Sequence, residues 1–435
     1  MTQRKPRRKL HRRTVLAGAT AGVAASSLPL PWVSRYSALA AEPIVLGMPT
    51  AQTAAAGVAD HADHLNGATL AMEEVNAAGG ILGRELKLQV VDVDPLSPES
   101  CQISIRKLVD AKVHAITTAF TLVPIPTADA TVSYGCPFLW GVTQRDYTEQ
   151  VRKNPERYSN CFQTDPSEVH YGYTMPIFLQ DMVDRGLWEP KNMGIHLVQE
   201  QIAYNQTISR ALTEVVPDSN FEIVKVTDIQ FPVQDWGPVI REIKQTGAGM
   251  VMINHWVAAE YAAFCKQFRA DPLEGALVYM QYGPSQPEFL ELAGPAAEGF
   301  VWSTVLGVYA DEKGREFREK YQKRFPGVMG LVYTGNAYDT VYILKAAWEA
   351  VGDPNKFKEV NDWVRTNAYR GVCGLYDMNN EWQECAHYPP NGRPVEAMEL
   401  EKGMGQLYVQ VQDGEHKIIY PDALKESALR PWPWI

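Results

Sequence analysis

Several aromatic side chains stand at or just after the ends of short apolar runs, where they could bind a small molecule. They are Trp140, Tyr204, Trp256 and Tyr282. Aromatic walls suit an apolar or aromatic molecule, or a cation held over the ring faces. The alternative is that these rings only form the packed rim of a hydrophobic core.

Motifs for covalent or metal chemistry are missing from the sequence. It contains no G-x-S-x-G nucleophile turn, no HExxH zinc motif and no phosphate-binding loop. The nine histidines have no spacing typical of a metal site, so no metal and no cofactor are indicated. Asp92 and Asp94 follow an apolar run, where acids more often serve turns and helix caps. An enzyme is therefore disfavoured.

Residues 1–40 have the pattern of a signal peptide. Residues 1–13 contain seven basic residues and no acid, and an apolar Ala/Gly-rich stretch runs from Val15 to Leu30. Ala38-Leu39-Ala40 then supplies small residues for cleavage. A retained membrane anchor is the alternative, but the run is weakly apolar and too short to cross ~30 Å of hydrocarbon.

The segment Arg12-Arg13-Thr14-Val15-Leu16 resembles the twin-arginine export motif. His11 stands where the motif usually has Ser, and the Lys that usually follows is missing. No cysteine ends the leader, so we expect an exported protein in the periplasm without a lipid anchor.

In an oxidising compartment some of the six cysteines should pair. They form no CxxC motif and no cluster with histidine. Cys373 and Cys385 bracket a segment that Asn379-Asn380 marks as a hairpin, so a disulfide between them is favoured. A Cys136–Cys161 bridge is the second choice, and free buried thiols are the alternative for the others.

Charge and composition narrow the class of protein. The 435 residues are 46% apolar and 21% charged, which is typical of a globular protein and long enough for two lobes of ~150–200 residues. Without residues 1–40 the chain has 33 basic and 51 acidic residues, a formal net charge of −18. Such a surface repels phosphate backbones, so nucleic-acid binding is disfavoured. No later segment has the ~20 apolar residues of a transmembrane helix.

Apolar strand-like runs alternate with amphipathic helix-like segments from Ile44 onward. This pattern predicts strands at 44–48, 86–91, 114–117 and 137–140, and helices at 66–77, 100–111 and 126–133. Strands without polar alternation, separated by helices, predict an α/β fold with a parallel sheet covered on both faces.

The same alternation restarts after a loop-rich stretch at 145–157, which predicts a second lobe. The expected strands are 193–198, 221–226, 250–253 and 277–280. The expected helices are 204–215, 236–246, 258–268, 287–292, 314–324, 336–351 and 355–366. The tail has two further strand-like runs, at 406–412 and 417–419.

An ordered set of segments carries a resemblance to a known family. They are Leu70–Gly83 (LAMEEVNAAGGILG), Val90–Asp92 with the Cys101 helix, Asp235–Gly247, Glu288–Gly294, Ala296–Gly299, Tyr338-Asp339 and Gly371–Asp377. In this order they resemble the type I periplasmic solute-binding proteins of ABC transporters, and the leucine/isoleucine/valine-binding branch above all. The resemblance covers nearly all of the chain after residue 40.

The resemblance implies two doubly wound parallel-sheet lobes, joined by three crossovers, that close on a ligand. It places 43–162 and 306–372 in the first lobe, 163–305 and 373–420 in the second, and 421–435 in a C-terminal tail. Hinges would lie near Phe162–Asp165, Ser303–Leu306 and Gly371–Cys373.

The ligand site is expected beyond the carboxyl ends of the strands, near the helix N-termini. By the resemblance, the loops after the third and fourth strands hold a ligand carboxylate, with Thr121 and Thr143 as hydroxyl donors. Helix capping is the alternative role of both threonines. The resemblance also makes Tyr204 and Trp256 site aromatics. Phe120, Gly141, Glu200 and Gln281 are secondary candidates.

One departure from the family concerns the ligand ammonium. The family often has an acid in the loop that here reads Gln281-Tyr282-Gly283, and this loop has none. Since an unpaired buried charge costs several kcal/mol, either Glu200 replaces that acid or the ligand has no ammonium. His255 is expected to be a satisfied histidine. The remaining tryptophans that we assign to the core are Trp236, Trp302, Trp348 and Trp363.

Together, these observations predict a monomeric substrate-binding component of an ABC importer. Its partners would be a small organic solute and a permease in the inner membrane. The resemblance makes a branched-chain or other hydrophobic amino acid the default solute, with amides, urea-like compounds and aromatic carboxylates as alternatives. A ligand-sensing receptor subunit of the same fold is the alternative function, and an exported enzyme is a third.

Overall fold

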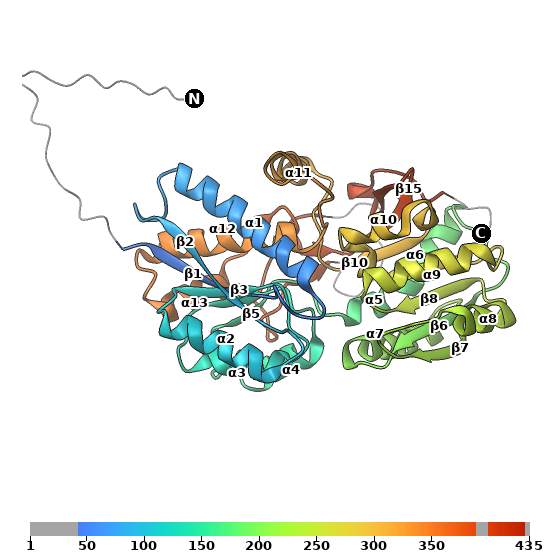
Figure 1. Ribbon diagram of the computed structural model, residues 1–435, viewed down its shortest axis with the longest axis horizontal. Coiled ribbons are helices and arrows are strands. Elements are labelled where there is room, and N and C mark those ends of the chain that lie inside the picture. The colour runs from blue at the N-terminus through green and yellow to red at the C-terminus, as the bar shows by residue number, and fades with distance from the viewer. Residues whose placement is uncertain (1–41, 389–398, 431–435) are drawn as a thin grey trace, which may run out of the picture. The chain divides into compact units, whose positions relative to one another are not determined.

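A computed structural model describes residues 42–388 and 399–430 (Figure 1). The predicted signal peptide and its twin-arginine-like motif lie outside the described residues, and so do residues 431–435 of the predicted tail. The described residues belong to one compact unit.

The first sheet consists of five parallel strands in the order β2-β1-β3-β4-β5. The strands are β1 (Ile44–Thr50), β2 (Leu86–Asp92), β3 (Ala115–Thr118), β4 (Phe138–Trp140) and β5 (Cys161–Gln163). One face is covered by α1 (Val58–Ala77) and α12 (Tyr333–Val351) (Figure 1). The other face is covered by α2 (Pro98–Asp110), α3 (Pro124–Val132) and α4 (Arg145–Lys153). Burial on both faces explains the continuous apolar runs of the central strands.

The second sheet has seven strands in the order β16-β15-β10-β9-β8-β6-β7. Its parallel strands are β6 (Gly194–Glu200), β7 (Glu222–Ile229), β8 (Met250–Asn254), β9 (Leu277–Gln281) and β10 (Val301–Thr304). The tail adds β15 (Leu407–Gln412) and β16 (Glu415–Tyr420) in antiparallel pairing. The covering helices are α5 (Val169–Tyr173), α6 (Met175–Asp184) and α7 (Ala203–Val215) on one face, and α8 (Gly237–Thr246), α9 (Ala258–Ala270) and α10 (Glu288–Ala293) on the other.

The chain passes between the two sheets three times: after β5, after β10 and after β12. The remaining elements are α11 (Glu312–Arg324), α13 (Phe357–Thr366), β11 (Tyr369–Gly371), β12 (Gly374–Tyr376), β13 (His387–Tyr388) and β14 (Met404–Gly405). The predicted fold class, two doubly wound lobes joined by three crossovers, is confirmed. We call the layers around the first sheet the first lobe and those around the second sheet the second lobe. The residue boundaries given above for the lobes stay predictions.

Helix α1 begins well before the position that the apolar pattern indicates. It starts at Val58, whereas the pattern predicts a start at residue 66. Its first two turns bury four polar side chains, namely Asp60, His61, Asp63 and His64. Since hydrophobic periodicity treats such residues as exposed, it cannot detect a helix end whose buried face is polar.

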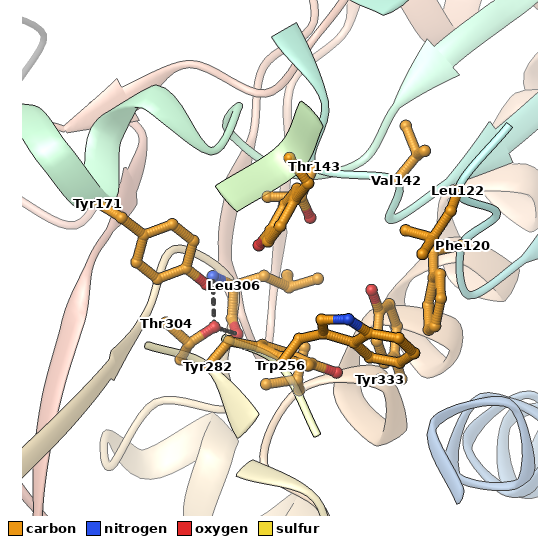
Figure 2. Close-up of a pocket in the computed structure, with 12 residues that line it drawn as sticks. Phe120, Leu122, Val142, Thr143, Tyr171, Trp256, Tyr282, Thr304, Leu306 and Tyr333 are labelled. Atoms are coloured by element: carbon orange, nitrogen blue, oxygen red, sulfur yellow. Dashed lines mark hydrogen bonds between the residues drawn. The ribbon is translucent and has the colours of Figure 1, made fainter. Parts of the chain in front are cut away.

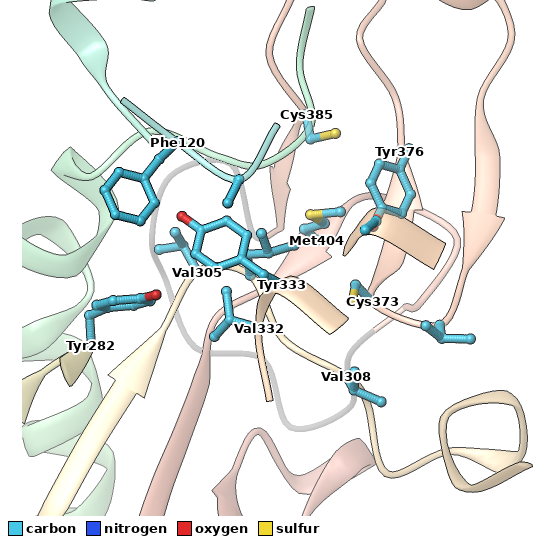
Figure 3. Close-up of a cluster of buried hydrophobic side chains, with 14 of the residues drawn as sticks. Phe120, Tyr282, Val305, Val308, Val332, Tyr333, Cys373, Tyr376, Cys385 and Met404 are labelled. Carbon is cyan, nitrogen blue, oxygen red and sulfur yellow. The ribbon is translucent and has the colours of Figure 1, made fainter. Parts of the chain in front are cut away.

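The predicted Cys373–Cys385 disulfide is absent, because all six cysteines are free buried thiols. The segment between them is not the expected hairpin: β12 turns back to pair with β11, so Cys373 lies in the turn between these strands. The backbone N–H of Cys373 donates to Asp339 of α12 at 3.0 Å, whereas that of Cys385 donates to Gln163 of β5 at 3.0 Å. Figure 3 draws the two side chains on these separate segments.

A stability test follows from the close packing of α1 on α12. A Cβ atom on Gly67 would lie 2.0 Å from the carbonyl oxygen of Thr334. Gly67→Ala should therefore destabilise the protein by about 1–3 kcal/mol, although Gly→Ala inside a helix otherwise stabilises by about 1 kcal/mol. Urea unfolding measures the effect. Gly237→Ala is the matched control, since that Cβ would meet only side chains, at 3.1 Å and beyond. Equal stability of Gly67→Ala and the unmodified protein would contradict the packing.

Candidate ligand-binding site

A cavity with about 460 Å³ of empty space lies where the carboxyl ends of the strands of both sheets meet (Figure 2). Six aromatic residues line it: Phe120, Tyr171, Tyr204, Trp256, Tyr282 and Tyr333. The other lining residues are aliphatic or carry a hydroxyl group: Leu122, Val142, Thr143, Thr304, Leu306 and Val332. The position is the one at which open parallel sheets bind ligands.

Rings from the two lobes contact each other across this cavity. Phe120 follows β3 in the first lobe, and its ring centre lies 6.2 Å from that of Trp256, which follows β8 in the second lobe. The Tyr333 ring, at the start of α12, lies 5.8 Å from Phe120 and 6.4 Å from Tyr282. The same aromatic wall is thus built by both lobes.

Five of the residues nominated from the sequence line the cavity. They are Phe120, Thr143, Tyr204, Trp256 and Tyr282. Two other nominees lie directly behind these lining residues. Gly141 accepts a hydrogen bond from the Tyr333 hydroxyl at 2.9 Å, and the Gln281 amide donates to the Tyr204 hydroxyl at 3.0 Å.

Thr121 and Trp140 are nominees that the structure places away from the cavity. The Thr121 hydroxyl pairs with that of Thr127 in α3 at 3.1 Å. The Trp140 ring lies in the first-lobe core, 4.4 Å from Phe138 and 5.1 Å from Tyr147. Phe138 and Trp140 are two positions apart on β4 and therefore share the face that α2, α3 and α4 cover.

Glu200 does not face the cavity either. Its carboxylate lies 2.7 Å from Nδ1 of His255, and Glu260 lies 3.0 Å from Nε2 of the same ring. Burial lowers the pKa of His255, but hydrogen bonds and attraction from the two carboxylates outweigh burial, so the net shift is upward. The pair of acids holds the loop that carries Trp256, and each ring nitrogen of His255 lies within ion-pair distance of one acid.

The indole N–H of Trp256 belongs to a ring that lines the cavity. The side chain is only 6% exposed, and its Nε1 has no hydrogen-bond partner among the described residues. Figure 2 shows this nitrogen turned toward the interior of the cavity. A buried donor without a partner costs free energy, and an acceptor atom placed in the cavity would satisfy this one.

Two residues that line the cavity have a positive backbone angle φ, which is uncommon for residues other than glycine. Thr143 has φ 52°, and Tyr282 has φ 54° with ψ −57°. Such conformations cost about 1–3 kcal/mol and persist where surrounding contacts impose them. Asp165 accepts hydrogen bonds from both the backbone N–H and the hydroxyl of Thr143. Tyr282 is held from the other lobe.

The group that holds Tyr282 is the carboxyl group of Asp60, which is buried in α1 of the first lobe. The Tyr282 hydroxyl donates to Asp60 at 2.5 Å, and the Gln286 amide donates to the other carboxylate oxygen at 2.6 Å. Burial raises the pKa of Asp60 to about 7, although both hydrogen bonds lower it. Asp60 thus ties the first lobe to the loop after β9 in the second.

Sequence reasoning missed Asp60 and the lining residues of the crossovers and α12. Tyr171, Thr304, Leu306, Val332 and Tyr333 do not follow a strand that the pattern predicted, so the strand-end rule could not find them. In the part of the chain that the structure describes, no group of three His, Cys, Asp or Glu side chains could hold a metal ion. No described helix is both long and apolar enough to cross a membrane.

Comparison with known proteins shows consistent similarities over most of the chain. A family model described as periplasmic binding protein matches residues 43–398. The leucine-, isoleucine-, valine-, threonine- and alanine-binding protein of Pseudomonas aeruginosa is 20% identical over 310 residues, 71% of this chain and 78% of that protein.

Solved structures give the same picture. A candidate branched-chain amino acid ABC transporter from Silicibacter pomeroyi has a TM-score of 0.82 at 26% identity, covering 90% of this chain and 100% of that one. An ABC transporter solute binding protein from R. palustris, in complex with benzoate, has a TM-score of 0.66 at 16% identity. It covers 89% of this chain and 98% of that one, and this second likeness shows the fold alone.

The buried Asp60 carboxyl predicts a pH dependence of stability. Its pKa rises from 3.8 to about 7 on folding, so the folded form keeps its proton while the unfolded chain ionises. Stability should therefore fall as pH rises from about 4 to 7, by up to about 4 kcal/mol, and this contribution should be constant above that range. Asp60→Asn removes the effect. Denaturant unfolding at several pH values measures the difference between variant and parent.

The control for this titration is Asp110→Asn, which changes an exposed carboxylate of α2. Because this side chain is exposed, the substitution should change the free energy of unfolding by less than about 0.5 kcal/mol. If the free energies of unfolding of Asp60→Asn and the parent changed equally with pH between 4 and 7, Asp60 would not be a buried group that titrates in this range.

Proposed function

Because the chain belongs to the periplasmic binding protein family, as the sequence resemblance predicted, we propose that it is the solute-binding component of an ABC importer. It captures a small organic solute between its lobes and presents the closed form to a permease in the inner membrane. The observation that carries this proposal is the cavity whose lining comes from both lobes. A solute that touches both lobes stabilises the closed form, and only such differential contacts shift a conformational equilibrium.

The proposed ligand contacts are Phe120, Thr143, Tyr204, Trp256 and Tyr282. The aromatic wall supports a hydrophobic solute of roughly the size of an amino-acid side chain or a single ring. The amino acids in the name of the Pseudomonas aeruginosa relative and the benzoate of the R. palustris complex are both molecules of that kind. Because the function is capture, we propose no reaction.

We further propose that residues 1–40 direct export and are then removed, so that the protein acts in the periplasm as a monomer. The basic start, the apolar stretch and the Ala38-Leu39-Ala40 segment support this proposal. The permease would be the partner that receives the closed form.

A thermal-shift screen of the purified protein tests capture. A solute at a hundredfold excess over its Kd should stabilise the protein by about 2.7 kcal/mol. Trp256→Ala should weaken binding of any such solute at least ~10-fold, because it removes a ring that both lobes contact. Trp140→Phe is the matched control: it alters a core tryptophan outside the cavity and should leave the Kd unchanged. Equal loss of affinity in both variants would contradict the proposed site.

Export is tested by expressing the full chain in a bacterium with both export routes. Mass spectrometry of the periplasmic fraction should show a chain that begins close to residue 41. The double variant Arg12→Lys, Arg13→Lys should keep the protein in the cytoplasm. Normal export of the double variant would exclude the twin-arginine route, and recovery of the intact N-terminus would exclude cleavage.

A further inference from the structure

The acidic side chains around the cavity already form hydrogen bonds or ion pairs with other groups of the protein. This limits which charged groups of a solute the cavity could bind. None of the twelve lining residues has a charged side chain. A buried ion without a partner costs several kcal/mol, so each charge of a solute would need a free counter-charge nearby.

An ammonium group finds no free carboxylate in the described part of the site. Asp60, which lies against Tyr282, already accepts from that hydroxyl and from Gln286. Glu200 is not among the lining residues, and its carboxylate is paired with His255 at 2.7 Å. Neither acid can turn to a solute without leaving a buried donor unpaired.

A solute carboxylate would need free backbone N–H groups in the first lobe, at the N-terminus of α4 and in the loop after β3. The N-terminus of α4 would attract an anion through its backbone N–H groups. Here these groups bond to side chains of the first crossover: Thr143 to Asp165, Gln144 to the Gln163 amide oxygen at 3.0 Å, and Arg145 to Glu168 at 2.6 Å. At the loop after β3, the N–H of Leu122 donates to the carbonyl of Pro95 at 2.9 Å. The protein's own groups have taken the positions that a solute carboxylate would need.

Among the twelve described residues that line the cavity, Nε1 of Trp256 is the side-chain polar atom without a hydrogen-bond partner, and it is buried and turned into the cavity. From these three observations we infer that the cavity takes an uncharged solute: a ring or branched apolar body with one hydrogen-bond acceptor that receives the Trp256 N–H. Zwitterionic amino acids are excluded. This inference rests on the proposed function, because it takes the cavity to be the site of the transported solute.

Aromatic walls also permit a second charge class, an organic cation held over the ring faces. The Trp256 N–H argues against it, because a donor at the centre of the wall repels a cation and is left without an acceptor. The cation is therefore one arm of the test.

Four probes that share one phenyl ring separate the charge classes. They are benzamide, which is uncharged, benzoate as the anion, phenylalanine as the zwitterion and benzyltrimethylammonium as the cation. Leucine and isovaleramide repeat the zwitterion and the uncharged form on a branched aliphatic body. Calorimetric titration of the purified protein should give the amides a Kd at least ~10-fold lower than any charged probe of the same body.

The donor is tested by Trp256→Phe, which keeps a ring and removes the N–H. This variant should weaken benzamide about 2–10-fold, the usual range for one hydrogen bond, whereas Trp140→Phe should not. An amino acid or the cation binding as tightly as the amides would overturn the inference and leave the proposed capture function standing. Failure of every probe, and of a wider solute screen, would overturn both.

Discussion

Tyr282 crosses from the second lobe to the first, and its hydrogen bond to Asp60 is the contact on which the arrangement of the site depends. The backbone of Tyr282 is strained, and Asp60 is buried with a pKa that burial raises and the Tyr282 hydrogen bond lowers. The contact joins the two lobes beside the cavity. The ring of Tyr282 and its neighbour Tyr333 can then face Phe120 and Trp256 across one shared space.

Much of the fold follows from the sequence because strand–helix alternation and continuous apolar strands have a direct physical cause in a doubly covered parallel sheet. The strand-end rule likewise nominated four residues that line the cavity, Thr143, Tyr204, Trp256 and Tyr282, and their contact with a ligand stays a prediction. It failed at Trp140, since whether a ring at a strand end faces the core or the cavity depends on which face of the strand it occupies. It could not find Asp60 or Tyr333, whose role arises only when segments hundreds of residues apart meet. The prediction of a Cys373–Cys385 disulfide was wrong because the segment between the two cysteines does not form the expected hairpin. Its strand β12 pairs with β11, which precedes Cys373.

The N-terminus of a helix beside the cavity is a general anion site, and here Asp165 and Glu168 fill it from within. Filling such a site with the chain's own carboxylates removes the charge requirement from the solute without changing a strand or a helix. In the inference proposed above, selectivity rests on ring packing and on the Trp256 N–H, and this agrees with the absence of an acid from the loop at Tyr282.

The central claim is that a solute lies in this cavity and touches both lobes. A crystal structure of the protein with its tightest-binding solute tests it most directly. We predict electron density between Trp256 and Tyr333, in contact with Phe120 of the first lobe and with an acceptor atom at hydrogen-bond distance from the indole nitrogen. Density outside this space, or in contact with one lobe alone, would contradict the account.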